Sequence, residues 1–326
     1  MEVSKDVAKV LKKNNVEVTL YNWDVKRIPD MNIIFIGNLF SLSISYLQRF
    51  LPERNVVAYS ITEGIPIVEA ISRKIGEKIT FITPSLYTKQ CLEQAGLTVT
   101  EVIQHGVDLN PKIDHAFHDY IKQKIPQPSK VEPSNIILNI SGNVQRKALD
   151  KQMIAYKSVE HMVKDAYYIL HSGIGDTNII ALQTALELKR FWFTNLWGVL
   201  AKPKIQALYA LCDFYSQASF CEGFGLTYLE AFAHNKPVIG IDCSGVSEIV
   251  KDGYTGILLA VTKTEDIVWQ QRHAIRLYYY DIDSLIDAIL VLCDQKTRRQ
   301  ISENVKKEKH RWNMENHYKK FLKYLI

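Results

Sequence analysis

Short runs of β-branched and aromatic residues alternate with longer amphipathic stretches along nearly the whole chain. In the first third, we expect strands at residues 16–21 (VEVTLY), 32–37 (NIIFIG), 55–60 (NVVAYS), 78–83 (KITFIT) and 99–104 (VTEVIQ). Helical stretches lie between them, and in PSLYTKQCLEQAG we expect Ser85 to cap the helix and Gly96 to end it. This alternation is typical of a parallel sheet with crossover helices.

A second alternating series begins at residue 135. Its expected strands are residues 135–142 (NIILNISG), 167–173 (YYILHSG), 191–195 (FWFTN), 212–219 (CDFYSQAS), 236–242 (KPVIGID) and 255–260 (TGILLA). A segment that ends in KIPQPSKVEPS separates the two series, and its prolines and polar residues are typical of a connection between domains.

These patterns predict an α/β protein with two Rossmann-like domains that face each other across a cleft. We expect an N-terminal acceptor domain at 1–110, a linker at 111–134 and a C-terminal donor domain at 135–304. Residues 305–326 are expected to form a helix that packs back on the N-terminal domain.

Composition narrows the class of protein. The chain has 326 residues, of which 47% are hydrophobic and 23% charged, and its formal net charge is +5. This weak, dispersed positive charge argues against a nucleic-acid-binding module. The five cysteines form no C-x-x-C pair, as expected of reduced thiols in a cytoplasm. No apolar run is long enough to span a membrane, so we expect a cytoplasmic protein whose Lys-rich terminal helices leave peripheral membrane contact open.

One stretch, ASFCEGFGLTYLEAFAHNKPVIG at residues 218–240, carries candidate chemistry. Glycines at 223 and 225 lie between an expected strand and an expected helix, where the free N–H groups of the helix start attract phosphate. Glu230 lies about 6 Å along that helix, at 1.5 Å per residue, which suits a carboxylate bound to ribose hydroxyls. Glu222, on the loop, is expected to point into the cleft toward a sugar.

Residues 219–259 closely resemble the signature of the retaining glycosyltransferases with the two-Rossmann GT-B architecture, the group that includes sucrose synthase and bacterial mannosyltransferases. The family's E-x7-E pair falls on Glu222 and Glu230. The likeness continues upstream through KPKIQALYALCDFYSQAS, SGNVQRKALDKQMIAYKSV and ITPSLYTKQCLEQAGLTVTEVIQHGVD, so it covers most of the chain.

The resemblance implies further site residues. Basic side chains in the loop SGNVQRK would neutralise a diphosphate, so the catalytic candidates are Glu222, Lys147 and Arg146. A base would lie near TNLWG, and the turn that precedes the family acid Glu248 would lie beside the sugar. The donor-binding candidates are Gly142, Asn195, Leu196, Gly223, Phe224, Gly225, Leu226, Thr227, Glu230, Ser244 and Gly245.

The implied reaction is glycosyl transfer with retention of anomeric configuration, without a metal or other cofactor. The donor would be a nucleotide-diphosphate sugar of the UDP or GDP type, and the acceptor is an unknown glycan, lipid or protein. Glu222 would orient sugar hydroxyls and stabilise positive charge at the anomeric carbon, while two cations hold the leaving diphosphate. Two alternatives stay open: a nucleotide-sugar-binding protein without turnover, and an epimerase of similar architecture.

The sequence departs from the family pattern in its first domain. The helix SKDVAKVLKKN begins almost at Met1, so we expect the family's first strand and glycine-rich loop to be missing and this domain to be shortened. Where relatives carry a histidine near the acceptor, AYSITEGIP offers Ser60, Thr62 and Glu63. Asn235 replaces the usual glycine at a helix exit, where it still tolerates a left-handed cap.

Three other features have more ordinary interpretations. The sequence Asp281-Ile282-Asp283 is expected to cap a helix rather than to bind a metal. His105 is expected at a hinge or between the domains, and His171 is expected in the core.

Overall fold

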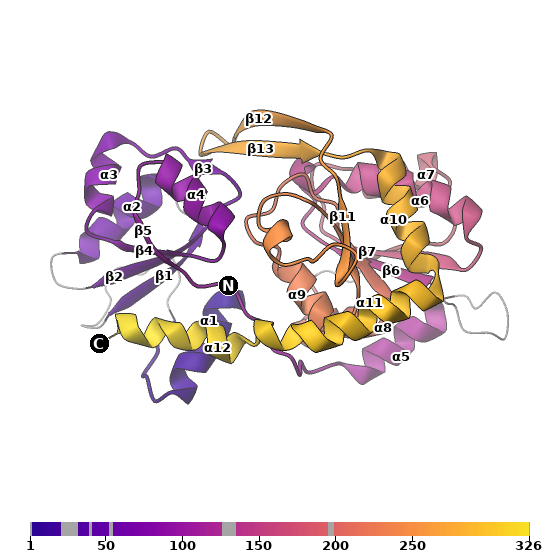
Figure 1. Cartoon of the computed structure of the whole chain (residues 1–326), viewed down its shortest axis with the longest axis horizontal. Coiled ribbons are helices and arrows are strands. Elements are labelled where there is room, and N and C mark those ends of the chain that lie inside the picture. The colour runs from indigo at the N-terminus through magenta and orange to yellow at the C-terminus, as the bar shows by residue number, and fades with distance from the viewer. Residues whose placement is uncertain are drawn as a thin grey trace.

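The computed structural model describes residues 2–20, 32–38, 41–51, 55–125, 135–194 and 199–325. Two parallel sheets, each flanked by helices, form two α/β domains joined side by side (Figure 1). This arrangement agrees with the predicted fold class of two Rossmann-like domains.

The N-terminal sheet has the strand order β1-β2-β4-β5. Its strands are β1 (Ile33–Asn38), β2 (Val56–Ile61), β4 (Thr80–Thr83) and β5 (Val99–Val102), which confirms four of the five expected strands. The expected strand at 16–21 is wrong for residues 16–20, which pair with none of the described strands, and residue 21 lies outside the described residues. The helices of this part are α1 (Glu2–Lys13), α2 (Ser41–Leu47), α3 (Ala70–Gly76) and α4 (Leu86–Gln94).

The ends of α4 follow the sequence signals. The Ser85 side chain accepts a hydrogen bond from the backbone N–H of Thr88, and Gly96 has a φ of 81° just beyond the helix. Both predictions are confirmed.

The C-terminal sheet has the order β11-β10-β9-β6-β7-β8. Its strands are β6 (Asn135–Ile140), β7 (Ala166–His171), β8 (Phe191–Phe193), β9 (Phe214–Ser216), β10 (Val238–Ile241) and β11 (Gly256–Leu259), all of them expected. The helices are α5 (His115–Lys124), α6 (Leu149–Met162), α7 (Ile179–Ala185), α8 (Lys202–Leu211), α9 (Leu226–Ala233) and α10 (Ile282–Cys293). Across both domains, the described residues also form the short 3-10 helices η1 (Gln48–Phe50), η2 (Gln145–Lys147), η4 (Val246–Glu248), η5 (Lys309–Trp312) and η6 (Lys319–Tyr324).

Two helix caps in this domain were also expected. The Asp281 side chain accepts a hydrogen bond from the N–H of Asp283, which confirms its role as the cap of α10. Asn235 has a φ of 59° beyond the end of α9, so the left-handed exit is confirmed as well.

A third, small sheet connects the two domains, and the sequence did not predict it. The hairpin of β12 (Lys263–Trp269) and β13 (His273–Tyr279) extends from the C-terminal domain across the top of Figure 1 and pairs with β3 (Ile65–Pro66) of the N-terminal domain. Gly64 lies so close to β13 that an added Cβ would come within 2.5 Å of the Ala274 carbonyl oxygen. The bridge therefore fixes the backbone just before β3.

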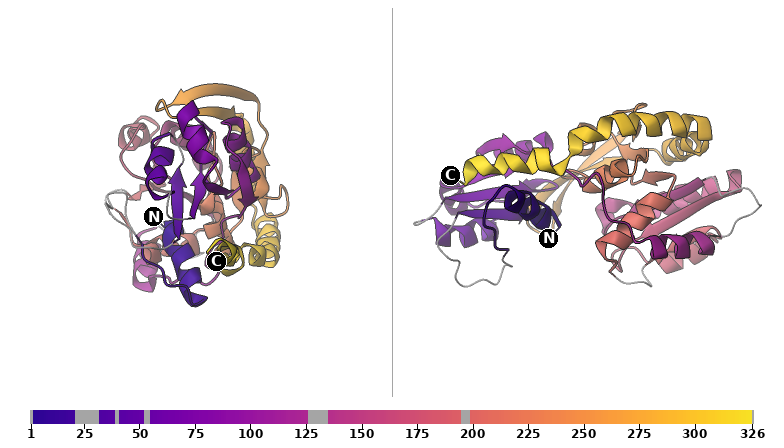
Figure 2. Two further views of the ribbon diagram at one scale, coloured as in Figure 1. Left: turned by 90° about the vertical axis from the view of Figure 1, so that its left-hand side faces the viewer. Right: turned by 90° about the horizontal axis from the view of Figure 1, so that it is seen from below.

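The C-terminal segment makes a second connection. Helix α11 (Gln295–Glu308) lies on the C-terminal domain, and α12 (Met314–Tyr318) and η6 continue along the N-terminal domain (Figure 2). Between them, Asn313 forms a parallel bridge with Val107, at the crossing between the domains. Tyr318 and Phe321 share a buried cluster with α1 and the N-terminal sheet, so the apolar faces of the terminal helices are buried in the core.

His105 lies at the point where these parts meet. Its Nδ1 lies 2.9 Å from the Tyr59 hydroxyl and 3.4 Å from the Tyr318 hydroxyl, and its ring meets the edge of Phe224 at a centroid distance of 4.9 Å. Burial lowers the pKa of His105 to about 3, from an ordinary value of 6.5, with a further contribution from nearby His317. The imidazole is therefore neutral in the folded protein at physiological pH.

This buried histidine makes stability depend on pH. Between pH 6.5 and pH 3 the unfolded chain binds a proton at His105 that the folded chain does not, so stability falls as the pH drops through 6.5. From pH 7 to pH 5, His105 alone is expected to cost about 2 kcal/mol of unfolding free energy. Urea unfolding at both pH values measures this loss, and His105→Asn should show a smaller one. An identical loss in the variant and the wild type would contradict the assignment.

Candidate functional site

The topology of the C-terminal sheet brings two loops together. The chain runs from β6 outward through β7 and β8 and then returns to β9 on the other side of β6. The carboxyl ends of β6 and β9 therefore flank the point where strand order reverses, which is where ligands bind in such sheets. The two loops are joined directly, because the N–H of Phe220 donates to the Arg146 carbonyl at 2.8 Å.

An ion cluster occupies this point. The Lys147 ammonium forms a hydrogen-bonded ion pair with Glu222, and Arg146 Nη1 lies 3.6 Å from the other oxygen of the same carboxylate. Arg146 Nη2 also lies 2.7 Å from Glu63, which comes from the N-terminal domain. Two cations and two carboxylates thus meet at the boundary between the domains.

The cluster keeps its charges although it is largely buried. Burial alone would raise the pKa of Glu222, but Lys147 and Arg146 outweigh it and hold that pKa below its usual value. Burial would lower the pKa of Arg146, yet its two carboxylate partners raise it. Burial does lower the pKa of Lys147, and the attraction of Glu222 offsets part of that effect. Glu222 is therefore a carboxylate at neutral pH.

Gln217, at the carboxyl end of β9, orients Glu222. Its Nε2 donates to Glu222 Oε1 at 2.9 Å, and its Oε1 accepts from the Thr227 hydroxyl at 2.7 Å. The backbone N–H of Glu222 donates to the Ser244 hydroxyl at 3.2 Å. Gln217 is not among the predicted site residues, although a polar residue at the end of a strand and directly before the motif was a signal that could have identified it.

Glycine is required twice in the turn that follows Glu222. Gly225 precedes α9 with a φ of 99°, which side chains with a Cβ rarely adopt. Gly223 lies against the N-terminal domain, where an added Cβ would come within 2.4 Å of the Thr62 carbonyl oxygen. The turn is therefore shaped both by its own backbone and by the opposite domain.

Side chains of the N-terminal domain also hold this turn. The Ser85 hydroxyl donates to the Gly223 carbonyl at 2.7 Å. The Glu248 carboxylate accepts from the N–H groups of Leu86 at 3.0 Å and Tyr87 at 2.9 Å, so it caps α4 from across the domain boundary. In this structure Glu248 thus binds α4 of the opposite domain.

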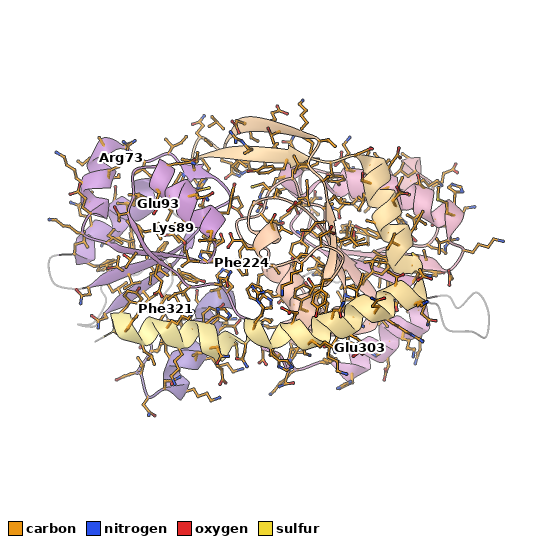
Figure 3. All side chains as sticks on the ribbon, in the orientation of Figure 1. Arg73, Lys89, Glu93, Phe224, Glu303 and Phe321 are labelled. Carbon is orange, nitrogen blue, oxygen red and sulfur yellow. The ribbon has the colours of Figure 1, made fainter. Side chains whose placement is uncertain are left out.

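The remaining predicted residues differ in what surrounds them. Phe224 lies between the two domains (Figure 3), with its ring against His105 and Trp312. Gly245 packs against the backbone of Phe224, whereas Gly142 lies in open space, with no atom within 4 Å of an added Cβ. Glu230, on α9, accepts a hydrogen bond from the Tyr209 hydroxyl at 3.2 Å.

With this geometry established, comparison with known proteins places the chain in a family. The model of the family described as glycosyl transferases group 1 matches residues 121–308, more than half of the chain. The chain belongs to this family. The prediction of a glycosyltransferase, which is a transferase enzyme, is thereby confirmed.

Individual relatives support the same placement. Uncharacterized glycosyltransferase 335 of Sulfolobus islandicus rod-shaped virus 1 is 24% identical over 332 residues, which cover 98% of this chain and 95% of the relative. The structure of HepE from Anabaena in complex with UDP aligns with a TM-score of 0.68 and 18% identity, covering 97% of this chain and 80% of HepE. S. aureus TarM aligns with a TM-score of 0.61 and 16% identity, covering 84% of this chain but only 51% of TarM. At these low sequence identities, the two structural alignments establish a shared fold and nothing more.

The fold of this glycosyltransferase brings most of the predicted site residues to one place. Lys147, Arg146 and Glu222 lie in the ion cluster. The turn 223–227, with Ser244 and Gly245, lies beside it. Asn195 and Leu196 lie outside the described residues. His171, which contacts the Thr194 hydroxyl, is half-buried at the end of β7. The roles given to these residues stay predictions.

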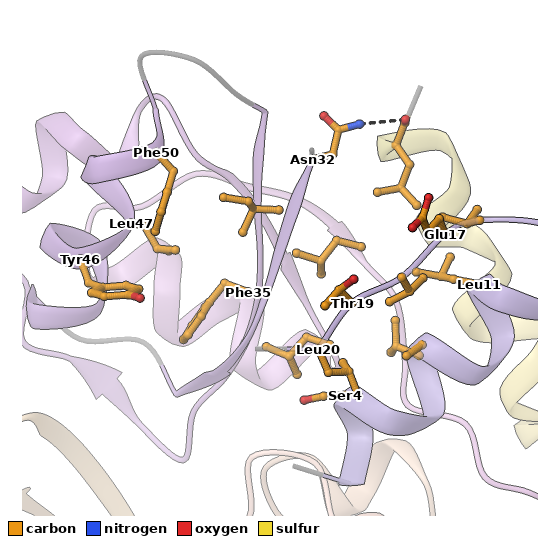
Figure 4. Close-up of a pocket in the computed structure, with 18 residues that line it drawn as sticks. Ser4, Leu11, Glu17, Thr19, Leu20, Asn32, Phe35, Tyr46, Leu47 and Phe50 are labelled. Atoms are coloured by element: carbon orange, nitrogen blue, oxygen red, sulfur yellow. Dashed lines mark hydrogen bonds between the residues drawn. The ribbon is translucent and has the colours of Figure 1, made fainter. Parts of the chain in front are cut away.

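A separate cavity of about 220 Å³ lies in the N-terminal domain of this glycosyltransferase (Figure 4). Apolar side chains from α1, β1 and α2 line most of it, and the Asn32 amide at its rim donates to the Leu325 carbonyl at 2.9 Å. Its lining shares no residue with the ion cluster.

In the described part of the chain, no set of three or more His, Cys, Asp or Glu side chains is placed to hold a metal ion. Within the same residues, no helix is both long and apolar enough to cross a membrane.

The ion cluster makes stability sensitive to Lys147. Lys147→Met leaves a buried Glu222 with less positive charge around it, so we expect a loss of about 3 kcal/mol in unfolding free energy. The double variant Lys147→Met/Glu222→Gln should regain most of that loss, because the uncompensated charge is gone. Urea unfolding compares these proteins with Lys151→Met, a change on α6 outside the cluster. A Lys147→Met protein as stable as the wild type would show that the pair contributes nothing.

Proposed function

We propose that this protein is a retaining, metal-independent glycosyltransferase that uses a nucleotide-diphosphate sugar of the UDP or GDP type. The observation that carries the proposal is the convergence of Lys147 and Arg146 on Glu222, beside the glycine turn that begins α9. This arrangement combines cations for a diphosphate with a carboxylate for a sugar, at the expected ligand position of the sheet.

The two cations, Lys147 and Arg146, support departure of a nucleoside diphosphate. An ammonium, a guanidinium and the N–H groups at the start of α9 are charge-assisted or dipolar donors that stabilise phosphate oxygens. Because they are held in place before the reaction, they stabilise the negative charge that develops on the leaving group. In this proposal they perform the task that a divalent cation performs in other transferases.

The Glu222 carboxylate supports a reaction that retains the anomeric configuration without a nucleophile from the protein. The Glu222 carboxylate is engaged by Lys147, Arg146 and Gln217, which makes it a weak nucleophile. We infer that it orients sugar hydroxyls and stabilises positive charge at the anomeric carbon. The bond from that carbon to the diphosphate oxygen breaks, the acceptor oxygen bonds on the same face, and the acceptor proton passes to the leaving diphosphate.

The E-x7-E pattern also suggests which residues recognise the nucleotide. Glu230 follows the glycine turn on α9, so its carboxylate is assigned to the ribose hydroxyls, and Asn195 and Leu196 are assigned to the base. HepE, whose fold this chain shares, was solved in complexes with UDP and with UDP-glucose, which favours a donor of this class. The acceptor is a glycan, a lipid or a protein. A cytoplasmic location with peripheral membrane contact is part of the proposal.

The donor assignment is tested by ligand-induced stabilisation. Wild type and Glu230→Gln are melted with UDP-, GDP- and ADP-sugars. A ligand at about 100 times its dissociation constant should add about 2.7 kcal/mol of stability to the wild type. Glu230→Gln should lose most of this effect, because the ribose contact is weakened, whereas Glu303→Gln on the exposed face of α11 should keep it.

The outcomes separate the candidate functions. Stabilisation by one class of nucleotide sugar, lost in Glu230→Gln, supports the donor site. The same stabilisation without transfer to any acceptor and without epimerisation would favour a binding protein. If no nucleotide sugar stabilises the wild type, the donor site is wrong.

A further inference from the structure

Glu63 is a residue of the N-terminal domain that reaches the ion cluster of the C-terminal domain. It lies between β2 and β3, in a turn closed by a hydrogen bond from the Thr62 hydroxyl to the Gly64 carbonyl at 2.6 Å. Two residues later, β3 pairs with β13 of the bridging hairpin. The backbone position of Glu63 is therefore fixed from both sides.

Contacts from the C-terminal domain and from α4 fix it further. The Glu63 carbonyl accepts hydrogen bonds from the Tyr87 hydroxyl and the Cys221 thiol, each at 2.9 Å. Its carboxylate is directed to Arg146 Nη2 at 2.7 Å. The Arg146 guanidinium is thus shared between carboxylates of the two domains.

A diphosphate bound at this cluster would compete for the same guanidinium. The four side chains carry two positive and two negative charges, so the cluster is neutral overall, and phosphate oxygens form stronger ion pairs with its cations when they replace one of the carboxylates. Glu222 has 8% of its side chain exposed and is also held by Lys147 and Gln217. Glu63 has 23% exposed, and Arg146 is its ion-pair partner. Glu63 is therefore the carboxylate that is easier to displace.

We propose that Glu63 is a further residue of the donor site, acting through Arg146. It competes with the donor diphosphate for the guanidinium, so donor binding and the Glu63–Arg146 contact between the domains exclude each other. Glu63 thereby weakens donor binding and couples it to the contact between the domains. This inference rests on the proposed function, because it requires a diphosphate at Lys147 and Arg146.

Calorimetric titration with UDP, GDP and inorganic pyrophosphate tests this proposal. Competition predicts that Glu63→Gln binds pyrophosphate and the preferred nucleotide about 3- to 10-fold more tightly than the wild type, because one nearby negative charge is gone. Glu63→Asp, with a shorter reach to Arg146, should show intermediate affinities. Glu77→Gln, the same charge change on an exposed part of this domain, should bind like the wild type.

The direction of the change decides between two roles. A residue that merely holds Arg146 in position would give weaker binding when replaced, so equal or weaker affinity in Glu63→Gln overturns the proposal. A gain for UDP or GDP without one for pyrophosphate also overturns it, since the competition would not lie at the phosphates. If neither wild type nor Glu63→Gln binds any of the three probes, the proposed function fails and this inference fails with it. Circular dichroism of each variant checks the fold. If Glu63→Gln unfolds, the affinities of Glu63→Asp are compared with those of the wild type instead.

Discussion

The buried attraction between Lys147, Arg146 and Glu222 is the interaction on which the rest of this site depends. Charges removed from water are costly unless each has a partner, so the loops after β6 and β9 must meet within hydrogen-bond distance. The strand order supplies that meeting, because β6 and β9 are neighbours although their loops are 75 positions apart in sequence. The strand order therefore brings the charged residues together, and their attraction in turn stabilises the packing of the two loops.

The contact between the domains is built around the same loops. Ser85 binds the Gly223 carbonyl, Glu248 caps α4, and Glu63 reaches Arg146. The hairpin takes part too, since the N–H of Tyr278 donates to the Phe220 carbonyl while β13 pairs with β3. Groups that would surround a donor thus also hold the two domains together. A ligand that rearranges one set of contacts must affect the other.

Local sequence signals predicted most of the fold. Buried strands such as residues 135–140 (NIILNI) are mostly apolar and rich in β-branched residues, and caps such as Ser85 and Asp281 bind backbone N–H groups within four residues of themselves. The hairpin was missed because β12 reads KTEDIVW, whose charged half is exposed and lacks an apolar run. Residues 16–20 carry the apolar alternation of a strand but pair with no strand of the described chain, because pairing depends on partners outside the segment.

The site was predictable only where its residues share a motif. Glu222, the glycine turn and Lys147 were candidates from a family signature, and the structure places them together. Glu63 was noted only near the expected acceptor position, and its contact with Arg146 could not be predicted, since the two residues are 83 positions apart and belong to different domains. Its role arises from the tertiary packing of β3 on β13, which no local pattern encodes.

The claim that this cluster binds a diphosphate is tested most directly by titrating UDP and GDP into Lys147→Met, with Lys151→Met as the control, below the melting temperature of each protein. The account predicts that Lys147→Met weakens binding of the preferred nucleotide at least about tenfold, or about 1.4 kcal/mol, while Lys151→Met leaves it unchanged. Equal affinity of Lys147→Met and the wild type would contradict the account, because the diphosphate would then bind elsewhere.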